Sequence, residues 1–206
     1  MTRESLAEVK SVAGPKAARV IPLLEQAVDA LGRDDPREAQ RVAEEAKRLA
    51  PRSATVREVL GLALYRAGRF KEALRELQAY RRISGRPDQN HLLADSHRAT
   101  GSPEKAIPLV QEALSSTIPE EARAEAAVVG GAALADLGRF DEALALLRRF
   151  DRGGSSSRPH DLRVWYVMGD VLERLGRRSE AADRFRRILD HDPDAYDVAE
   201  RLSALS

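Results

Sequence analysis

A short run of ionisable residues near the middle of the chain has the spacing of a possible chemical site. Asp88, His91 and Asp95 are three and four residues apart, and Arg98 follows after three more. On a helix, this spacing places all four side chains on one face. Two carboxylates and an imidazole could ligate a metal ion, but the neighbouring Arg98 opposes a bound cation. The other two interpretations are a solvated face with local ion pairs and a face that contacts a ligand.

The rest of the chain has no pattern that predicts catalysis. It contains no Cys, which excludes disulfides, thiolate zinc sites and cysteine nucleophiles. Neither a Gly-x-Ser-x-Gly nor a His-Glu-x-x-His motif occurs, and no nucleotide-binding glycine motif is present. The Gly153–Pro159 segment is rich in Gly and Ser and predicts a mobile linker. We therefore expect a protein that is not an enzyme, with no catalytic residue, cofactor or metal.

Charge and hydropathy limit the classes of partner. The 206 residues include 34 Lys and Arg and 33 Asp and Glu, a net charge of +1, whereas nucleic-acid and anionic-membrane binders favour a surplus of positive charge. The apolar run Ala126–Ala135 is far shorter than the roughly 20 residues of a membrane-spanning helix. Met1–Lys10 carries charges and no apolar stretch, unlike a secretory signal. We expect a cytoplasmic protein that binds neither nucleic acid nor membrane.

An internal repeat organises the chain. A short turn, one or two charged residues and an alanine recur five times, at steps of 34, 33, 37 and 38 residues, with the alanines at Ala39, Ala73, Ala106, Ala143 and Ala181. A period near 34 is typical of helix–turn–helix repeats. The turn contains a glycine, for example Gly32 or Gly68, which predicts the left-handed backbone that ends a helix. Small residues at Gly61, Gly131 and Gly169 predict close helix crossings, with large residues such as Leu77 and Phe185 filling the space around them.

In these residues the chain resembles the tetratricopeptide repeat (TPR) family. The unit of that family carries Trp-x-x-Leu-Gly-x-x-Tyr on its first helix, then Ala and Phe on its second, then Pro. The last repeat matches it with Trp165, Met168, Gly169, Leu172, Gly176, Ala181, Phe185, Ile188 and Pro193. The resemblance implies an all-α fold, a right-handed superhelical solenoid of about five TPR helix–turn–helix repeats with a C-terminal capping helix.

The period divides the chain into an N-terminal segment, an array and a cap. The five repeats are predicted at residues 20–53, 54–86, 87–123, 124–161 and 162–193. In segment 1–19, Leu6, Val9 and Val12 predict a short helix that folds back on the first repeat and covers that end of the groove. In segment 194–206, helical spacing predicts the cap, with its apolar side formed by Tyr196, Ala199, Leu202 and Leu205.

The resemblance also implies where a partner binds, because the first helices of TPR units line a concave groove. The groove positions carry Glu58, Tyr65, His91, Asp95, Arg98, Val128, Val129, Tyr166 and Asp170. In repeat four this helix is apolar nearly all round, so it is either an apolar anchor or an alanine-rich helix that its neighbours already shield. We predict a non-enzymatic interaction module or adaptor that holds a protein or peptide segment. The alternative is a structural role through homo-oligomerisation.

Overall fold

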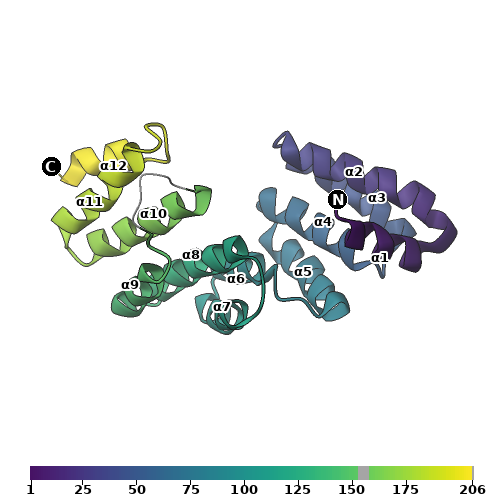
Figure 1. The fold of residues 1–206 in the computed structure, drawn as a ribbon, viewed down its shortest axis with the longest axis horizontal. Helices are drawn as coiled ribbons and strands as arrows, with labels where there is room; N and C mark the ends of the chain where they lie inside the picture. Colours follow the sequence, from purple (N-terminus) through teal and green to yellow (C-terminus); the bar gives the residue numbers. More distant parts are fainter. Residues whose placement is uncertain (153–157, 206) are drawn as a thin grey trace. The chain divides into compact units, whose positions relative to one another are not determined.

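The computed structural model describes residues 1–152 and 158–205, and within these residues every regular element is a helix. The chain forms two compact units, Met1–Gly101 and Ser102–Ser206, each with its own packed helices (Figure 1). The predicted all-helical class is therefore confirmed. The linker predicted at Gly153–Pro159 falls largely on residues 153–157, outside the described part of the chain.

Unit 1 is built from consecutive helices that pack on one another. Its elements are α1 (Arg3–Ala13), the 3₁₀ turn η1 (Gly14–Lys16), α2 (Ala17–Gly32), α3 (Pro36–Leu49), α4 (Ala54–Arg66), α5 (Phe70–Ser84) and α6 (Asn90–Ala99). Each helix from α2 to α5 packs on the next, and α4 also contacts α2 and α6. The first helices of the predicted repeats, α2, α4 and α6, therefore form a row. α1 packs on α2 and on α4.

Unit 2 continues the pattern. Its elements are η2 (Pro103–Lys105), α7 (Ala106–Ser115), α8 (Glu120–Asp136), α9 (Phe140–Arg148), α10 (Pro159–Arg174), α11 (Arg178–Leu189) and α12 (Val198–Leu205). α8 packs on α7, α9 and α10, and α12 packs on α11. In the described residues of both units, no helix is long and apolar enough to cross a membrane.

Positive-φ residues separate the helices of most pairs. Gly68, Gly138 and Gly176 have φ of 71°, 73° and 74°, as the glycine pattern predicts. The first pair differs, because Gly32 is the last residue of α2 and Asp34 takes the left-handed conformation at φ 57°. Asp tolerates this region better than most residues. The next residue, Asp35, accepts a hydrogen bond from the Glu38 amide at 3.0 Å and caps α3.

Large side chains close on glycines where paired helices cross. A Cβ on Gly61 would lie 2.7 Å from Leu77 Cδ2, one on Gly131 2.8 Å from Leu147 Cδ1, and one on Gly169 2.4 Å from Phe185 Cε1. These distances confirm the predicted small–large pairing. The large partners are fully buried, so each crossing is also the centre of its local core.

The C-terminal cap is shorter than predicted. α12 begins at Val198, and Tyr196 precedes it with φ 54° and 53% exposure, so Tyr196 does not share the apolar side of the helix. Val198 is fully buried, and Leu202 and Leu205 pack against the core of the unit. The cap therefore uses only the last two turns of segment 194–206.

Candidate functional site

In unit 1, side chains from α4 and α6 are joined across the row of first helices. The Tyr65 hydroxyl donates to Asp95 Oδ2 at 2.6 Å, and Arg98 Nε donates to Asp95 Oδ1 at 3.0 Å. Gln89, the residue before the start of α6, donates through Nε2 to Glu58 Oε1 of α4 at 2.7 Å. The structure thus brings together Tyr65, Asp95 and Arg98, which were predicted as groove residues from two different repeats, while Glu58 makes a separate contact with Gln89.

Burial and neighbouring charges make this face electrostatically unusual. Burial raises the pKa of the Glu58 carboxyl, and the nearby Asp88 carboxylate raises it further, against the Gln89 hydrogen bond that lowers it. Burial also raises the pKa of Tyr80, whose hydroxyl donates to Asp88 Oδ1 at 2.7 Å. A partner that brings a cation to Glu58 would favour its charged form.

The Asp88–His91–Asp95 triplet is engaged by neighbouring donors. Asp88 accepts from Tyr80 and forms an ion pair with Arg86 at 2.8 Å, while Asp95 takes the Tyr65 and Arg98 bonds. His91 Nδ1 lies 3.1 Å from the Asp88 main-chain oxygen. In the described residues, no three His, Cys, Asp or Glu side chains are arranged to hold a metal ion. The side chains form a half-buried polar surface with internal ion pairs.

The apolar helix of the fourth predicted repeat, α8, is mostly enclosed. Val128 is 9% exposed and belongs to the core of unit 2, and Ala135 is 1% exposed. Val129 and Ala132 are half-buried. Of the two interpretations of this helix, the packing favours the one in which its neighbours shield it. Of the two valines predicted to line the groove, Val128 and Val129, only Val129 keeps partial exposure.

The groove residues of α10 are covered by the chain itself. Arg201 of α12 donates to Asp170 Oδ1 at 3.0 Å and to Glu173 Oε2 at 2.6 Å. Tyr166, also on α10, donates its hydroxyl to Asp197 Oδ1 at 2.8 Å. The sequence did not reveal these contacts, since they join residues 28 to 31 positions apart. Tyr166 and Asp170 thus serve in part to dock the cap.

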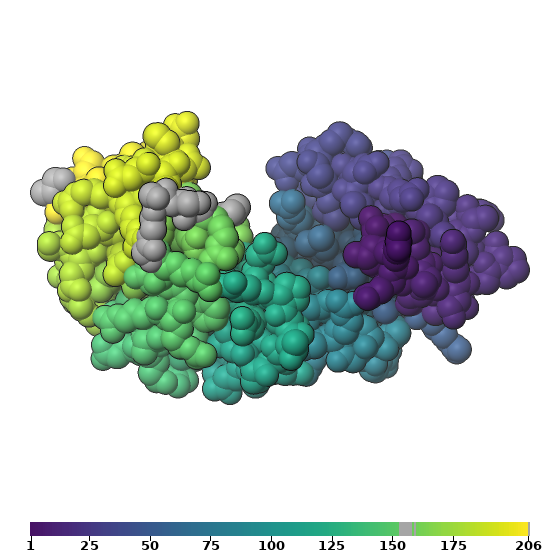
Figure 2. All heavy atoms as spheres, in the orientation of Figure 1, coloured from purple at the N-terminus to yellow at the C-terminus, as the bar shows by residue number. Residues whose placement is uncertain are grey.

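Near the N-terminus of the chain, α1 occupies part of the row of first helices in unit 1, where it packs on α2 and α4. Val9 is fully buried and Leu6 is half-buried, while Val12 is 44% exposed. Figure 2 shows the N-terminal segment, in dark purple, lying on the surface of this unit. Two of the three apolar residues of this helix are thus buried or half-buried. A polar contact that the sequence did not reveal accompanies them: the Glu8 carboxylate accepts from Ser53 Oγ and the Ala54 amide, at 2.7 and 2.8 Å.

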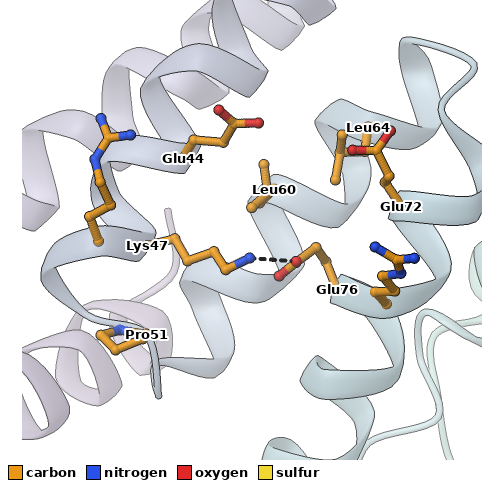
Figure 3. Close-up of a pocket in the computed structure, with 9 residues that line it drawn as sticks. Glu44, Lys47, Pro51, Leu60, Leu64, Glu72 and Glu76 are labelled. Carbon is orange, nitrogen blue, oxygen red and sulfur yellow. Dashed lines mark hydrogen bonds and ion pairs between the residues drawn. The ribbon is translucent and has the colours of Figure 1, made fainter.

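The second helices enclose a different feature, a pocket of about 440 Å³ (Figure 3). Leu60 and Leu64 of α4 form its apolar part, and charged side chains of α3 and α5 surround them. Lys47 Nζ donates to Glu76 Oε1, and Arg57 Nη1 donates to Glu76 Oε2, both at 2.6 Å. The Lys47–Glu76 pair joins α3 to α5 across the pocket, so this feature is part of the contact between successive helix pairs.

The equivalent contact in unit 2 has the opposite charges. Lys47 stands eight residues after Ala39, and Asp151 stands eight after Ala143. In the repeat that follows each of these, Glu76 stands three residues after Ala73, and Arg184 stands three residues after Ala181. Arg184 Nη1 donates to Asp151 Oδ2 at 2.7 Å, and Trp165 Nε1 donates to Asp151 Oδ1 at 2.9 Å. The charges on the two sides of each junction are thus opposite, and they differ between the two junctions. This favours one order of the repeats over others.

Comparison with known families matches two stretches of the chain. Residues 24–87 match a model described as "Tetratricopeptide repeat", and residues 92–194 match one described as "Tetratrico peptide repeat". The chain belongs to the tetratricopeptide repeat family. The predicted resemblance is confirmed, and the TPR fold is that of a protein–protein interaction module. A comparison with curated proteins finds no match.

Solved TPR structures share the fold at low sequence identity. TTC0263, a thermophilic TPR protein in Thermus thermophilus, superposes with a TM-score of 0.70 at 17% identity, covering 90% of this chain and 98% of that one. YrrB, described as a TPR protein with an unusual peptide-binding site, gives a TM-score of 0.59 at 21% identity over 88% and 90%. The quorum sensor NprR with its cognate peptide NprX gives 0.63 at 15% identity over 97% and 63%. These likenesses support the TPR fold.

Proposed function

We propose that this TPR chain is a non-enzymatic, cytoplasmic adaptor that holds a segment of a partner protein against its first helices. The observation that carries the proposal is the bonded face of α4 and α6 in unit 1, where Tyr65, Asp95 and Arg98 present a half-buried, pre-organised polar surface. Pre-organised side chains lose little entropy when a ligand binds them. YrrB, which has a peptide-binding site, and NprR, which binds its cognate peptide NprX, support the same class of ligand.

Contacts made by the first and last helices of the chain, α1 and α12, reduce the surface that is available to a partner. α1 occupies part of the row in unit 1, and α12 engages Tyr166 and Asp170 in unit 2. We assign the principal contacts to Glu58, Tyr65, His91, Asp95 and Arg98 in unit 1. In unit 2, we assign Val129 as an apolar contact, because Val128 is enclosed in the core.

The experiment is an affinity capture from the native host, read by mass spectrometry. The bait is the wild type beside a variant with Tyr65→Ala, Arg98→Glu and Val129→Glu. A matched control carries Arg82→Glu and Ile83→Ala, two exposed positions of the second helix α5. Circular dichroism and thermal denaturation establish that all three are folded.

We expect a partner that binds the wild type and the α5 control and is lost from the first-helix variant. A partner that survives the first-helix substitutions, or is lost equally from the α5 control, would contradict the proposed surface. If the bait enriches only itself and its mass rises with concentration, the protein instead acts through homo-oligomerisation.

A further inference from the structure

Helix α1 makes the contacts that a bound helical ligand would make. It packs on α2 and α4, the first helices of two successive repeats, and its Val9 side chain is fully buried. Leu6, one turn earlier, is half-buried on the same side. An amphipathic helix laid in a groove is anchored through such spacing. α1 therefore packs on α4, one of the two helices of unit 1 that carry the proposed partner contacts.

A carboxylate fixes the direction and register of α1. Besides the bonds from Ser53 Oγ and the Ala54 amide, the Thr55 amide donates to Glu8 Oε2 at 3.4 Å. These amides begin α4, where main-chain N–H groups lack partners within the helix and the helix dipole favours an anion. Ser53 and Thr55 are buried, at 0% and 6% exposure, so the carboxylate is held at a site with little water. This surface thus binds two features of α1, its apolar face and the Glu8 carboxylate.

Helix α1 buries fewer apolar residues than the neighbouring helix α2. Val9 is the one buried residue of α1, all of which the structure describes, whereas α2 buries Ala17, Val20, Leu24, Ala27, Ala30 and Leu31. The exposed Gly14–Pro15–Lys16 turn joins α1 to α2, with Gly14 at φ 54°. Segments with few buried apolar contacts open locally at a lower free energy than the rest of a fold.

We propose that α1 is a resident ligand of this groove and that the partner segment which displaces it is an amphipathic helix with a carboxylate in the place of Glu8. The proposal rests on the proposed function and specifies the chemistry of its partner. The acid caps α4, and apolar residues two positions before it and one after it replace Leu6 and Val9. Because α1 is tethered, its effective concentration is of millimolar order, so a free ligand competes only when the Glu8 contact is weakened or the ligand binds more tightly.

The test uses the full-length chain and a fluorescent synthetic peptide of residues 2–13. Three proteins are titrated: the wild type, Glu8→Gln, and the matched control Glu4→Gln. Glu4 lies on the same helix and carries the same charge, but its side chain is 86% exposed and its ion pair with Arg86 is long, at 3.8 Å. We expect Glu8→Gln to bind the peptide about tenfold more tightly than the wild type, with Glu4→Gln unchanged. Gln keeps one acceptor oxygen but loses the negative charge and the second acceptor at the start of α4.

A second peptide carries Glu8→Gln itself and should bind the Glu8→Gln protein about tenfold more weakly than the native peptide. Hydrogen exchange on the full chains locates the effect. Amides of α1 should exchange faster in Glu8→Gln than in the wild type or Glu4→Gln, and the native peptide should restore protection at residues 53–59.

The proposal is overturned if the Glu8→Gln protein binds the native peptide no better than the Glu4→Gln protein does, or if the exchange of α1 is the same in all three proteins. Reciprocal exchange of α1 between two wild-type copies, seen as a dimer, would also overturn it. These outcomes leave the proposed function standing, because the Tyr65, Arg98 and Val129 substitutions test it without altering α1.

Discussion

The crossing of α10 and α11 allows a stringent test of the packing, because Gly169 lies directly against an aromatic ring. A methyl group on Gly169 would lie 2.4, 2.8 and 3.0 Å from Cε1, Cζ and Cδ1 of Phe185. Carbon atoms in favourable contact are about 3.5–4.0 Å apart. Phe185 is fully buried, and three atoms of its rigid ring face the added group. The helices must therefore separate, or the ring must leave its position.

The expected size of the Gly169→Ala effect follows from two opposing terms. Replacing Gly by Ala inside a helix favours folding by about 1 kcal/mol. Overpacking a well-filled core costs about 1–3 kcal/mol, and a rigid buried ring places this site at the upper end. We therefore expect Gly169→Ala to lower the free energy of unfolding by about 1–2 kcal/mol. At Gly61, the obstructing atoms belong to the flexible Leu77 side chain, so Gly61→Ala should cost less.

A double-mutant cycle with Phe185→Leu identifies the cause. Leu is the residue found against the other two crossing glycines, at Leu77 and Leu147. Phe185→Leu alone should destabilise by leaving a cavity, and that cavity should accept the methyl group of Gly169→Ala. The double variant should then be more stable than the sum of the two single effects predicts, by roughly 1 kcal/mol or more.

Urea denaturation provides the assay. Trp165 is the single Trp of the chain and lies on α10 with Gly169, so its fluorescence reports on unit 2, while circular dichroism reports on the whole chain. An unchanged or increased stability of Gly169→Ala would refute the reasoning. Strict additivity in the cycle would show that the loss has another origin than the Phe185 contact.

Three further predictions concern charged groups. Glu76→Ala should lower the free energy of unfolding by about 1–2 kcal/mol, because it leaves Lys47 and Arg57 without their shared carboxylate. The more exposed Glu72→Ala should cost about 0.5 kcal/mol or less, as thermal denaturation by circular dichroism can verify, and equal losses would contradict this account. Glu58→Gln should stabilise the protein at pH 7, because burial raises the folded pKa of Glu58 and so penalises its charged form. The gain in stability from Glu58→Gln is fully present above the raised folded pKa and should vanish below the unfolded pKa of the carboxyl, near pH 4. Urea denaturation at pH 7 and below pH 4 measures the gain. A gain that persists at the lower pH would point to another cause. Arg201→Ala should destabilise unit 2 in Trp165 fluorescence, because it leaves Glu173 without its Arg201 partner and Asp170 with Arg174 alone. A salt concentration of 1 M should reduce the loss, and a loss that does not depend on salt would assign the role of Arg201 to packing.

Local sequence signals predicted most of the fold. Helical spacing, the repeat period and the turn glycines reflect interactions within a few residues, and the structure has the corresponding helices. Gly68, Gly138 and Gly176 adopt the left-handed conformation that the pattern predicts. The first turn was predicted wrongly at Gly32, since Asp34 also tolerates this conformation and, two residues before the start of α3, holds the position equivalent to Gly68.

The candidate site was predicted less completely. The resemblance to TPR units placed Tyr65, Asp95 and Arg98 on first-helix faces, and the structure joins them. The resemblance could not tell that Val128 is enclosed while Val129 keeps partial exposure, because both positions are apolar. Exposure on such a helix depends on which neighbouring helix covers each side, and that is a property of the packed unit.

The sequence by itself determined a helical TPR chain, with its turns and its small–large crossings, because each of these follows from residues close together or from a repeated pattern. The tertiary structure decided which groove positions the chain covers itself. Glu8 reaches the start of α4 across 45 or more residues, and Arg201 reaches α10 across 28 or more. Such long, flexible charged side chains have many possible partners in an unfolded chain, and only the packing of helices selects one.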